Sequence, residues 1–432
     1  MNLQRSLYLG KIRPFMNKPI IKVITGMRRS GKSVLMAQIQ EYLRREGTDE
    51  KNIIAFNFES MSIGHLRSSQ ALYDYVGGLI KERQGNKVYL FFDEVQEVDQ
   101  WERAINSFLV DFDCDIYISG SNAKLLSSEL STLIAGRYVA FEVLPLSFSE
   151  FVQMRQISDM GAPRAKGQES EEILQTDGLQ PSEHGLQSSG GRQSLFDLYV
   201  RFGGLPGLHM FPLNKDVSDQ YLRGIYATIL LKDIVQRHHI RDAELLERIV
   251  LYVSEQVGNT FSARSISRFL KNQGRSISAE TVYNYLNGLT DAYLVHRVSR
   301  YDLRGKGILE TQEKFYMNDL GLRNCLMEFQ NRDISGLLEN IVYLELKRRG
   351  YTLYVGKYDE REVDFVAIRH SEITYFQVCL TLAGERTVER EFAPLRMIPD
   401  HHPRFVLSMD PMWKENLDGI RWRNIMDFLL DM

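Results

Sequence analysis

Residues 20–33 read IIKVITGMRRSGKS, and this stretch decides how the first part of the chain folds. Ile20–Thr25 is an apolar, β-branched run of strand length. It leads directly into the pattern G-x-x-x-x-G-K-S, which is followed by the helical pattern VLMAQIQEYLRR. A strand, a glycine-bounded loop and a helix in this order predict a loop that cradles phosphate.

Each residue type in this loop has a chemical role. Gly26 and Gly31 permit backbone conformations that turn successive N–H groups toward a phosphate, and the helix that follows adds about half a positive charge there. Lys32 would reach the β- and γ-phosphates of a nucleotide, and the Ser33 hydroxyl would bind Mg²⁺. The expected nucleotide-binding residues are Gly26, Met27, Arg28, Arg29, Ser30, Gly31, Lys32, Ser33 and Val34.

A second signal is the run VYLFFDE at residues 88–94, in which an apolar strand pattern ends in two adjacent carboxylates. A buried strand would bring both to the edge of the sheet where the phosphate loop lies. Asp93 would complete the Mg²⁺ shell through water, and Glu94 would act as general base on the attacking water. Because the chain has no N-K-x-D stretch, ATP is expected rather than GTP.

Three further residues are candidates for the same reaction. The strand pattern DIYIS is followed by Gly120-Ser121-Asn122, and a polar side chain there would orient the water or touch the γ-phosphate. The sequence does not separate Ser121 from Asn122. Arg137, just before the fifth strand pattern, would act as an arginine finger across a subunit interface or would pair with a local carboxylate.

Composition bounds the remaining possibilities. The 432 residues suffice for about three domains. A net charge of −3 limits any nucleic-acid surface to a local patch. The cysteines Cys114, Cys325 and Cys379 form no C-x-x-C, which argues against a zinc ribbon or a disulfide framework. No apolar leader is found, and no apolar run approaches the roughly 20 residues that span a bilayer, so we expect a cytoplasmic protein without a membrane segment.

The order of patterns predicts the division of the chain. Alternating strands and helices up to residue 152 predict a parallel α/β sheet covered on both faces. A stretch rich in Gly, Ser, Gln, Glu and Pro predicts a mobile insertion. The expected parts are an α/β core at 1–152, a mobile polar insertion at 153–194, a helical lid or linker at 195–242, a winged helix-turn-helix at 243–313 and a second α/β domain at 314–432.

The winged helix-turn-helix rests on three helical patterns and a β-rich end. Helices are expected at 245–257, at 262–272 with Ser262 as N-cap, and at 279–289 with Ser278 as N-cap, before the β-rich run 292–298. This order is typical of a winged helix, in which Thr281, Asn284 and Tyr285 would face a DNA groove. The alternative, which the sequence leaves open, is a module that only packs against the rest of the chain or a neighbouring subunit.

Several motifs together carry a family resemblance: GMRRSGKS, FFDEVQEV, SGSNAKLLSSELSTLIAGR, LPLSFSEF, RFGGLPG and the terminal LLENIVYLELKRRGY, EVDFVAI and YFQVCLTL. In these the chain resembles the bacterial and archaeal AAA-type ATPases that carry a carboxyl-terminal domain of unknown function. The resemblance covers nearly the whole chain outside residues 158–193. It implies an additional-strand P-loop ATPase core, a winged helix, and at 314–432 a domain similar to the PD-(D/E)xK nucleases.

In that nuclease-like pattern a helix Glu, a strand Asp and an [EQ]-x-K on the next strand gather metal ions. Glu339, Asp364 and Gln377 match the first three positions, whereas Cys379 stands at the position of the lysine. A neutral thiol cannot stabilise the developing phosphorane charge. We therefore expect a degenerate site and a domain that binds DNA or protein rather than cutting it.

Three hypotheses follow. The first is an Mg²⁺-dependent ATPase of the AAA-like class. The second is a slow, nucleotide-switched protein that binds duplex DNA or acts as a scaffold. The third is a metal-dependent nuclease gated by ATP. An arginine finger in trans would also require a homo-oligomer, whose size the sequence does not fix.

Overall fold

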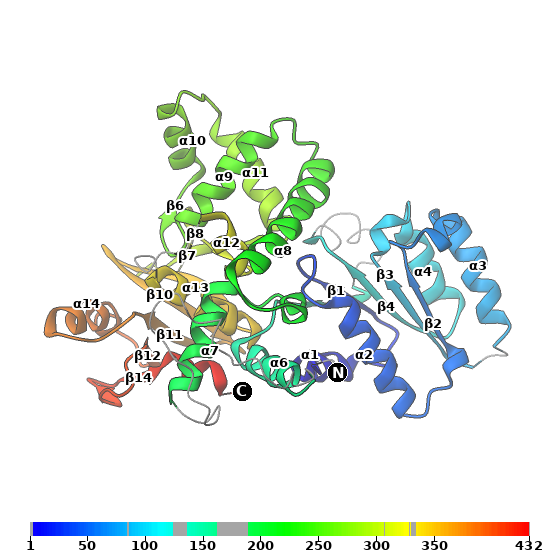
Figure 1. Cartoon of the computed structure of the whole chain (residues 1–432), viewed down its shortest axis with the longest axis horizontal. Helices are drawn as coiled ribbons and strands as arrows, with labels where there is room; N and C mark the ends of the chain where they lie inside the picture. Colours follow the sequence, from blue (N-terminus) through cyan, green and yellow to red (C-terminus); the bar gives the residue numbers. More distant parts are fainter. Residues whose placement is uncertain are drawn as a thin grey trace, which may run out of the picture. The chain divides into compact units, whose positions relative to one another are not determined.

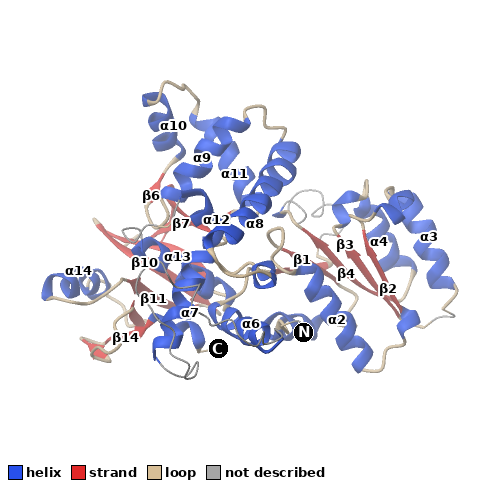
Figure 2. Cartoon of the chain, viewed as in Figure 1, coloured by secondary structure: helices blue, strands red, loops and turns tan. Residues whose placement is uncertain are grey.

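The computed structural model describes residues 3–83, 86–123, 136–161, 189–305, 307–327, 329 and 334–431. The chain forms two compact units. The amino-terminal unit comprises Asn2–Pro145 with Asp291–Tyr293, and the carboxyl-terminal unit comprises Leu146–Thr290 and the residues from Leu294 onward. Each unit holds one β-sheet with helices against it (Figure 2).

The amino-terminal unit alternates strands and helices, as its sequence pattern predicts. Its elements are α1 (Ser6–Ile12), η1 (Arg13–Phe15), β1 (Ile21–Thr25), α2 (Lys32–Arg45), η2 (Glu50–Asn52), β2 (Ile53–Asn57), η3 (Met61–Leu66), α3 (Ser69–Lys81), β3 (Val88–Asp93), η4 (Val95–Glu97), α4 (Trp101–Asp111), β4 (Cys114–Gly120) and β5 (Tyr138–Glu142). The five strands form one parallel sheet in the order β2-β3-β4-β1-β5.

Helices cover both faces of this sheet, as expected for buried parallel strands. On one face α3 and α4 place side chains such as Val76 and Phe108 against Leu90 and Ile116. On the other, α1 and α2 pack against a separate apolar cluster (Figure 1). Because β4 pairs with both β1 and β3, it separates the strand before the phosphate loop from the strand that carries the acid pair. This is the additional-strand arrangement of a P-loop NTPase.

The carboxyl-terminal unit begins with helices and ends in a mixed sheet. Its elements are α6 (Phe148–Gly161), α7 (Ser189–Phe202), η6 (Pro206–Met210), α8 (Lys215–Thr228), the π-helical η7 (Ile229–Gln236), α9 (Ala243–Glu255), β6 (Thr260–Phe261), α10 (Ala263–Asn272), α11 (Ala279–Asp291), β7 (Val295–Asp302), β8 (Gly307–Met317), α12 (Leu320–Met327), α13 (Ile334–Arg348), β9 (Thr352–Tyr358), β10 (Arg361–Arg369), β11 (Glu372–Val378), α14 (Glu385–Arg396), β12 (Arg404–Ser408), β13 (Asn416–Leu417), β14 (Ile420–Asn424) and α15 (Ile425–Leu430).

Its nine strands form a single sheet in the order β13-β14-β12-β11-β10-β9-β7-β8-β6. On one face Phe392 of α14 joins an apolar cluster with Val366 and Val406. On the other face Tyr343 of α13 stacks on Tyr316 with ring centroids 4.4 Å apart and lies near Phe365. The sheet is therefore sandwiched between α13 and α14 at the strands that carry the predicted nuclease-like residues.

Two of the three helices at residues 243–291, α10 and α11, begin at the predicted N-caps, and α9 begins two residues before its predicted start. Ser262 accepts a hydrogen bond from the Ser265 N–H at 3.2 Å, and Ser278 accepts one from the Thr281 N–H at 3.0 Å. Both therefore act as N-caps. The short strand β6 and the β7–β8 hairpin complete the expected order of elements. Tyr285, expected to face a groove, is instead buried in the core, because it shares the apolar face of α11 with Val282 and Leu289.

The Gly-Gly-Leu-Pro-Gly break at residues 203–207 wraps around a buried carboxylate. Asp319 accepts a hydrogen bond from the Gly204 N–H at 2.7 Å, and burial raises its pKa to about 6. Gly203 has φ +78°, and a Cβ at that position would lie 2.3 Å from Asp319 Oδ1. The glycine is therefore required both for the backbone angle and for the close approach.

Three expectations differ from the structure. The first nine residues of the predicted insertion, 153–161, continue α6, and 189–194 begin α7, while 162–188 lie outside the described residues. The helical lid or linker expected at 195–242 is not α-helical throughout, because α8 passes into a π-helical segment at Ile229. The expected boundary between residues 313 and 314 falls inside β8, so the helical module and the last domain share one sheet. In the described part of the chain, no helix has both the length and the apolarity to cross a bilayer.

Candidate functional site

The phosphate loop joins β1 to α2 through two glycines in conformations that other residues rarely adopt. Gly26 has φ +140° and Gly31 has φ +101°. A Cβ on Gly26 would lie 2.3 Å from the carbonyl oxygen of Val143, which follows β5. Only glycine therefore lets the loop pass this close to the neighbouring chain segment.

Lys32 lies at the first position of α2 and is 4% exposed. Its Nζ donates hydrogen bonds to the carbonyl oxygens of Gly26 at 3.1 Å and Met27 at 3.2 Å, and it lies 3.8 Å from Glu94 Oε1. The ammonium group thus sits inside its own loop, bonded to neutral carbonyls. A phosphate oxygen can replace these acceptors and would bind the cation more strongly, because a charge-assisted hydrogen bond is stronger than a bond to a carbonyl.

The acid pair lies at the carboxyl edge of the same sheet, where Asp93 is the last residue of β3 and Glu94 follows it. Asn57, at the end of β2, lies with its Nδ2 3.5 Å from Asp93 Oδ2, and the Ser119 hydroxyl donates a hydrogen bond to Asp93 Oδ1. The Glu94 N–H donates to Ser119 Oγ at 3.2 Å, and Glu94 has φ +53°. Gln96 donates to the Glu94 carboxylate. Both acids are therefore held by neighbouring polar groups.

Ser119 was not among the sequence candidates, although it contacts both members of the acid pair. It lies within β4, whose seven residues are all buried, and the strand pattern marks it as a core position. The predicted Ser121 and Asn122 follow β4 at the same carboxyl edge and are also buried. A polar residue directly after the apolar run Ile116–Ile118, near the carboxyl end of a central strand, was the signal that could have identified Ser119.

Of the remaining predicted residues, Met27 and Ser30 are buried, and the others lie on the outer side of the loop. Arg29 and Val34 are exposed, and Arg28 forms an ion pair with Glu59 at 2.9 Å. Ser33 is exposed, so its hydroxyl is accessible to a ligand. A serine hydroxyl and a carboxylate are donors that suit Mg²⁺, which takes its other ligands from phosphate and water. The side chains of Ser33 and Asp93 are therefore suitable ligands for the Mg²⁺ that the fold implies.

Arg137 lies at the opposite end of the sheet. Its carbonyl oxygen accepts a hydrogen bond from the Ile21 N–H, at the start of β1, and its guanidinium donates to Asn106 at 3.1 Å. Parallel strands put their amino and carboxyl ends on opposite edges. Arg137 is therefore not part of the nucleotide site of its own chain, and a role across a subunit interface stays a prediction.

The carboxyl-terminal unit brings three of the nuclease-like candidates together. Gln377 Oε1 accepts from the Asp364 N–H at 3.3 Å, and Glu339 faces Asp364 from α13. The ladder between β9 and β10 shifts register between Val363 and Val366, which marks a β-bulge. Such a bulge re-aims the side chains at its centre, and Asp364 lies within it.

A cation that the sequence pattern did not indicate lies at the centre of this group. Lys314 Nζ of β8 lies 2.6 Å from Glu339 Oε1, 2.7 Å from Glu362 Oε1 and 3.7 Å from Asp364 Oδ1. Tyr316 donates a further hydrogen bond to Glu339. The expectation of a degenerate nuclease-like site stays a prediction. Cys379 itself packs in the apolar cluster beneath α14.

We call this group the Lys314 cluster; its members are Lys314, Tyr316, Glu339, Glu362 and Asp364. Burial changes the pKa values of two of its carboxyl groups. Burial raises the pKa of Asp364 well above its usual range and also raises that of Glu339. Burial opposes the charge of Lys314, but the surrounding carboxylates outweigh it and raise the pKa of the lysine. The lysine is thus a fixed cation at neutral pH.

A metal ion does not fit the Lys314 cluster as it stands. The ammonium group lies where a metal would contact Glu339 and Glu362, and the second oxygen of Asp364 accepts the Val378 N–H at 2.8 Å. Throughout the described residues, no group of three or more His, Cys, Asp or Glu side chains could hold a metal ion. The cluster is complete without a metal.

Two family descriptions match parts of the chain: residues 18–152 match an AAA domain, and residues 193–333 match a domain of unknown function, DUF8612. An uncharacterized protein of Haemophilus influenzae is 34% identical over 428 residues, which cover 99% of this chain and 98% of that protein. The uncharacterized protein MJ1544 of Methanocaldococcus jannaschii is 31% identical over 380 residues, 86% of this chain and 77% of its own length.

Likeness to solved structures is distant. Cdc6p of Pyrobaculum aerophilum aligns with 79% of this chain and 95% of its own, at 12% identity and a TM-score of 0.31. AMPPCP-bound DnaA of Aquifex aeolicus aligns with 65% of this chain and 85% of its own, at 12% identity and a TM-score of 0.28. Scores this low support no conclusion about what this chain binds.

The relation to the Haemophilus protein, in contrast, runs over almost the whole of both chains. The AAA-domain match spans the strand, loop, helix and acid pair described above. The chain therefore belongs to one family with the uncharacterized Haemophilus protein and MJ1544, and its residues 18–152 form an AAA-type P-loop domain.

Proposed function

We propose that the amino-terminal unit binds ATP with Mg²⁺ and hydrolyses it. The observation that carries the proposal is the 3.8 Å distance between Lys32 Nζ and Glu94 Oε1 at the carboxyl edge of the parallel sheet. Lys32 follows the phosphate loop and Glu94 follows β3. The residue expected to bind phosphate and the residue expected to activate water therefore lie at the same edge. The AAA-domain match over residues 18–152 supports the same assignment.

Each residue of the site would have a separate role in ATP hydrolysis. Lys32 would exchange its loop carbonyls for phosphate oxygens, while Ser33 and Asp93 would hold Mg²⁺, which neutralises charge on the phosphates. Glu94 would accept the proton of the attacking water. Ser119 is a positioning residue, because it acts on the reaction only through the two acids that it contacts.

The test is ATP binding and turnover by the purified full-length chain with Mg²⁺, with and without duplex DNA. Lys32→Ala should abolish turnover because the phosphate loses its cation. Lys51→Ala, an exposed lysine of η2, is the matched control and should leave turnover unchanged. A chain that binds no ATP, or a Lys32→Ala chain that turns over ATP as before, would contradict the proposal.

A second candidate is a nucleotide-switched protein that binds duplex DNA through residues 243–313. It is favoured by the order α9, β6, α10, α11 and the β7–β8 hairpin, which matches a winged helix. On α10 the exposed side chains Arg264, Arg268 and Lys271 form no hydrogen bond or ion pair with any described residue, so they are available to phosphates. Duplex affinity that is equal with and without ATP would exclude the switch.

The cellular setting and assembly complete the proposal. We place the protein in the cytoplasm, where ATP and Mg²⁺ are available. Arg137 would reach a nucleotide only in a neighbouring copy, since it lies at the opposite edge from its own site. Particle mass measured with and without ATP tests this point: a mass that stays monomeric under all conditions would remove Arg137 from the mechanism.

A further inference from the structure

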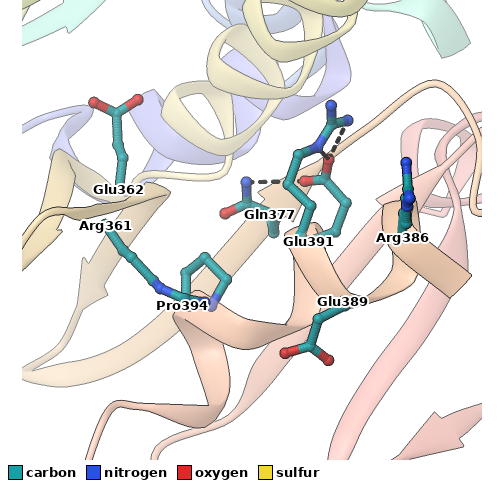
Figure 3. Close-up of a pocket in the computed structure, with 8 residues that line it drawn as sticks. Arg361, Glu362, Gln377, Arg386, Glu389, Glu391 and Pro394 are labelled. Atoms are coloured by element: carbon teal, nitrogen blue, oxygen red, sulfur yellow. Dashed lines mark hydrogen bonds and ion pairs between the residues drawn. The ribbon is translucent and has the colours of Figure 1, made fainter.

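A pocket of about 550 Å³ lies beside the Lys314 cluster in the carboxyl-terminal unit. Its wall comes from the start of β10, from β11 and from α14, and Figure 3 shows Gln377 between side chains of the other two elements. Its volume falls within the roughly 300–1,000 Å³ of small-ligand sites. The lining residues are Arg361, Glu362, Gln377, Arg386, Glu389, Arg390, Glu391 and Pro394.

All three carboxylates of the pocket already have a cationic partner. Glu362 pairs with Lys314 at 2.7 Å, as described above. Glu389 pairs with Arg396 at 2.7 Å, and Glu391 pairs with Arg390 at 2.6 Å (Figure 3). Each carboxylate of the lining therefore contacts a cation, and one of the three lining arginines is used in this way. Lys314 is shared with Glu339, and Arg396 is shared with Asp418.

Two positive charges remain. Arg361 and Arg386 are exposed and make no hydrogen bond or ion pair with any residue that the structure describes. They come from different elements, β10 and α14. The pocket floor adds a neutral amide, since Gln377 uses one N–H of its Nε2 to donate to Glu391 at 3.1 Å and has a second.

We propose that this pocket binds a phosphate-bearing ligand, held by the guanidinium groups of Arg361 and Arg386. Two arginines without a carboxylate partner favour an anion, and the planar guanidinium fork matches the paired oxygens of a phosphate. Lys314 reduces the repulsion that Glu362 would exert on this anion. The pocket is separate from the proposed ATP site, since all of its residues belong to the carboxyl-terminal unit.

Two sources carry this chemistry, a nucleic-acid backbone and a small phosphorylated molecule. The test uses the full-length chain with Lys32→Ala, which removes phosphate binding at the loop. A labelled single-stranded oligonucleotide and inorganic pyrophosphate serve as separate probes, at about 0.1 M salt so that surface charge is partly screened. Binding of the oligonucleotide alone identifies a nucleic-acid site, and binding of pyrophosphate alone identifies a site for small phosphorylated molecules.

In the same background, Arg361→Gln with Arg386→Gln should weaken binding of whichever probe binds by about tenfold or more, because both charged contacts are lost. The matched control removes two exposed charges elsewhere in the unit, Lys414→Gln with Arg421→Gln, and should leave affinity nearly unchanged. Binding of neither probe, or equal loss in both double variants, would overturn the proposal. The four side chains are exposed, and an unchanged unfolding midpoint would establish that each variant is folded.

Discussion

Each unit of the molecule holds a buried lysine beside carboxylates, yet the two lysines are bonded differently. Lys32 donates to two neutral carbonyls of its own loop and lies 3.8 Å from one carboxylate. Lys314 lies within 2.7 Å of oxygens from both Glu339 and Glu362. The first lysine therefore has one carboxylate at the outer limit of an ion pair, whereas the second has two in close contact.

The difference separates a site for an external anion from an internal ion pair. A phosphate improves the bonding of Lys32, because it replaces neutral acceptors by charged ones. A new anion at Lys314 would compete with carboxylates already in contact. We therefore propose that the same residue type serves ligand binding in one unit and stability in the other, and the following predictions test this contrast.

The largest effect is expected from Lys314→Met. The substitution keeps the shape of the stem but leaves Glu339 and Asp364 buried without a counter-ion, which should cost about 3–5 kcal/mol of unfolding free energy. Denaturant unfolding of the full-length chain measures it. Lys357→Met, on β9, which β7 separates from β8, is the control and should change little. A Lys314→Met chain as stable as the wild type would mean that the cluster is not a structural ion pair.

Lys32→Met should have the opposite profile. Because Lys32 gives up hydrogen bonds to neutral carbonyls and a 3.8 Å contact with Glu94, rather than two close carboxylates, unfolding free energy should fall by only about 1 kcal/mol. ATP affinity should fall by about 100-fold or more, equivalent to about 2.7 kcal/mol, since the phosphate loses its cation. Calorimetric titration with ATP and Mg²⁺ measures this. Strong destabilisation without loss of affinity would reverse the roles assigned to the two lysines.

His209 is a third buried titratable residue, and it differs from both lysines. Its ring nitrogens have no hydrogen-bond partner among the described residues. Burial lowers its pKa to about 4, with a contribution from Arg155. A depressed histidine pKa gives stability that is present above the unfolded value of about 6.5 and is lost as pH falls toward 4.

His209→Phe should therefore gain stability over the wild type as pH falls, by about 2 kcal/mol near pH 5 relative to pH 7. The ring of Phe151, 4.9 Å away, offers the new side chain an aromatic contact. Urea unfolding at both pH values measures the difference. The exposed His401→Phe is the control and should show no such trend. A His209→Phe chain whose advantage does not grow with acidity would refute the assignment.

The smallest effect is expected from Ser119→Ala. Loss of its contacts to Asp93 and Glu94 should lower ATP turnover by about tenfold while ATP affinity changes little, because Ser119 only positions the acids. Steady-state kinetics that separate kcat from KM measure this. Ser62→Ala, an exposed serine, serves as control. A loss confined to KM would place Ser119 in binding rather than in positioning.

The nucleotide site could be predicted because its signal is local. Strand, loop and helix follow one another within residues 20–45, and each glycine has a backbone reason to be there. The acid pair Asp93 and Glu94 could be predicted for the same reason, because it directly follows the apolar run at residues 88–92. Ser119 escaped prediction because it sits inside another such run, where the pattern favours a core residue.

The Lys314 cluster could not be predicted in full, because its cation comes from a distant strand. Lys314 and Glu339 are 25 residues apart, and the pattern at residues 377–379 points only to the local Cys379. The pairing of β8 within the shared sheet brings the lysine to the acids, and no sequence spacing reports that pairing. The burial of Tyr285 was not predicted either. The sequence offered Thr281, Asn284 and Tyr285 as exposed side chains of α11, and it did not show that Tyr285 is the one that faces the core.

The central claim is that Glu94 acts on water after ATP has been bound by the loop. The most direct test is a single-turnover measurement on Glu94→Gln, with Glu97→Gln, exposed in the same short turn, as the matched control. We predict that Glu94→Gln binds ATP with wild-type affinity and cleaves it at least about 100-fold more slowly, because the general base is lost. Cleavage at the wild-type rate by Glu94→Gln would contradict the account.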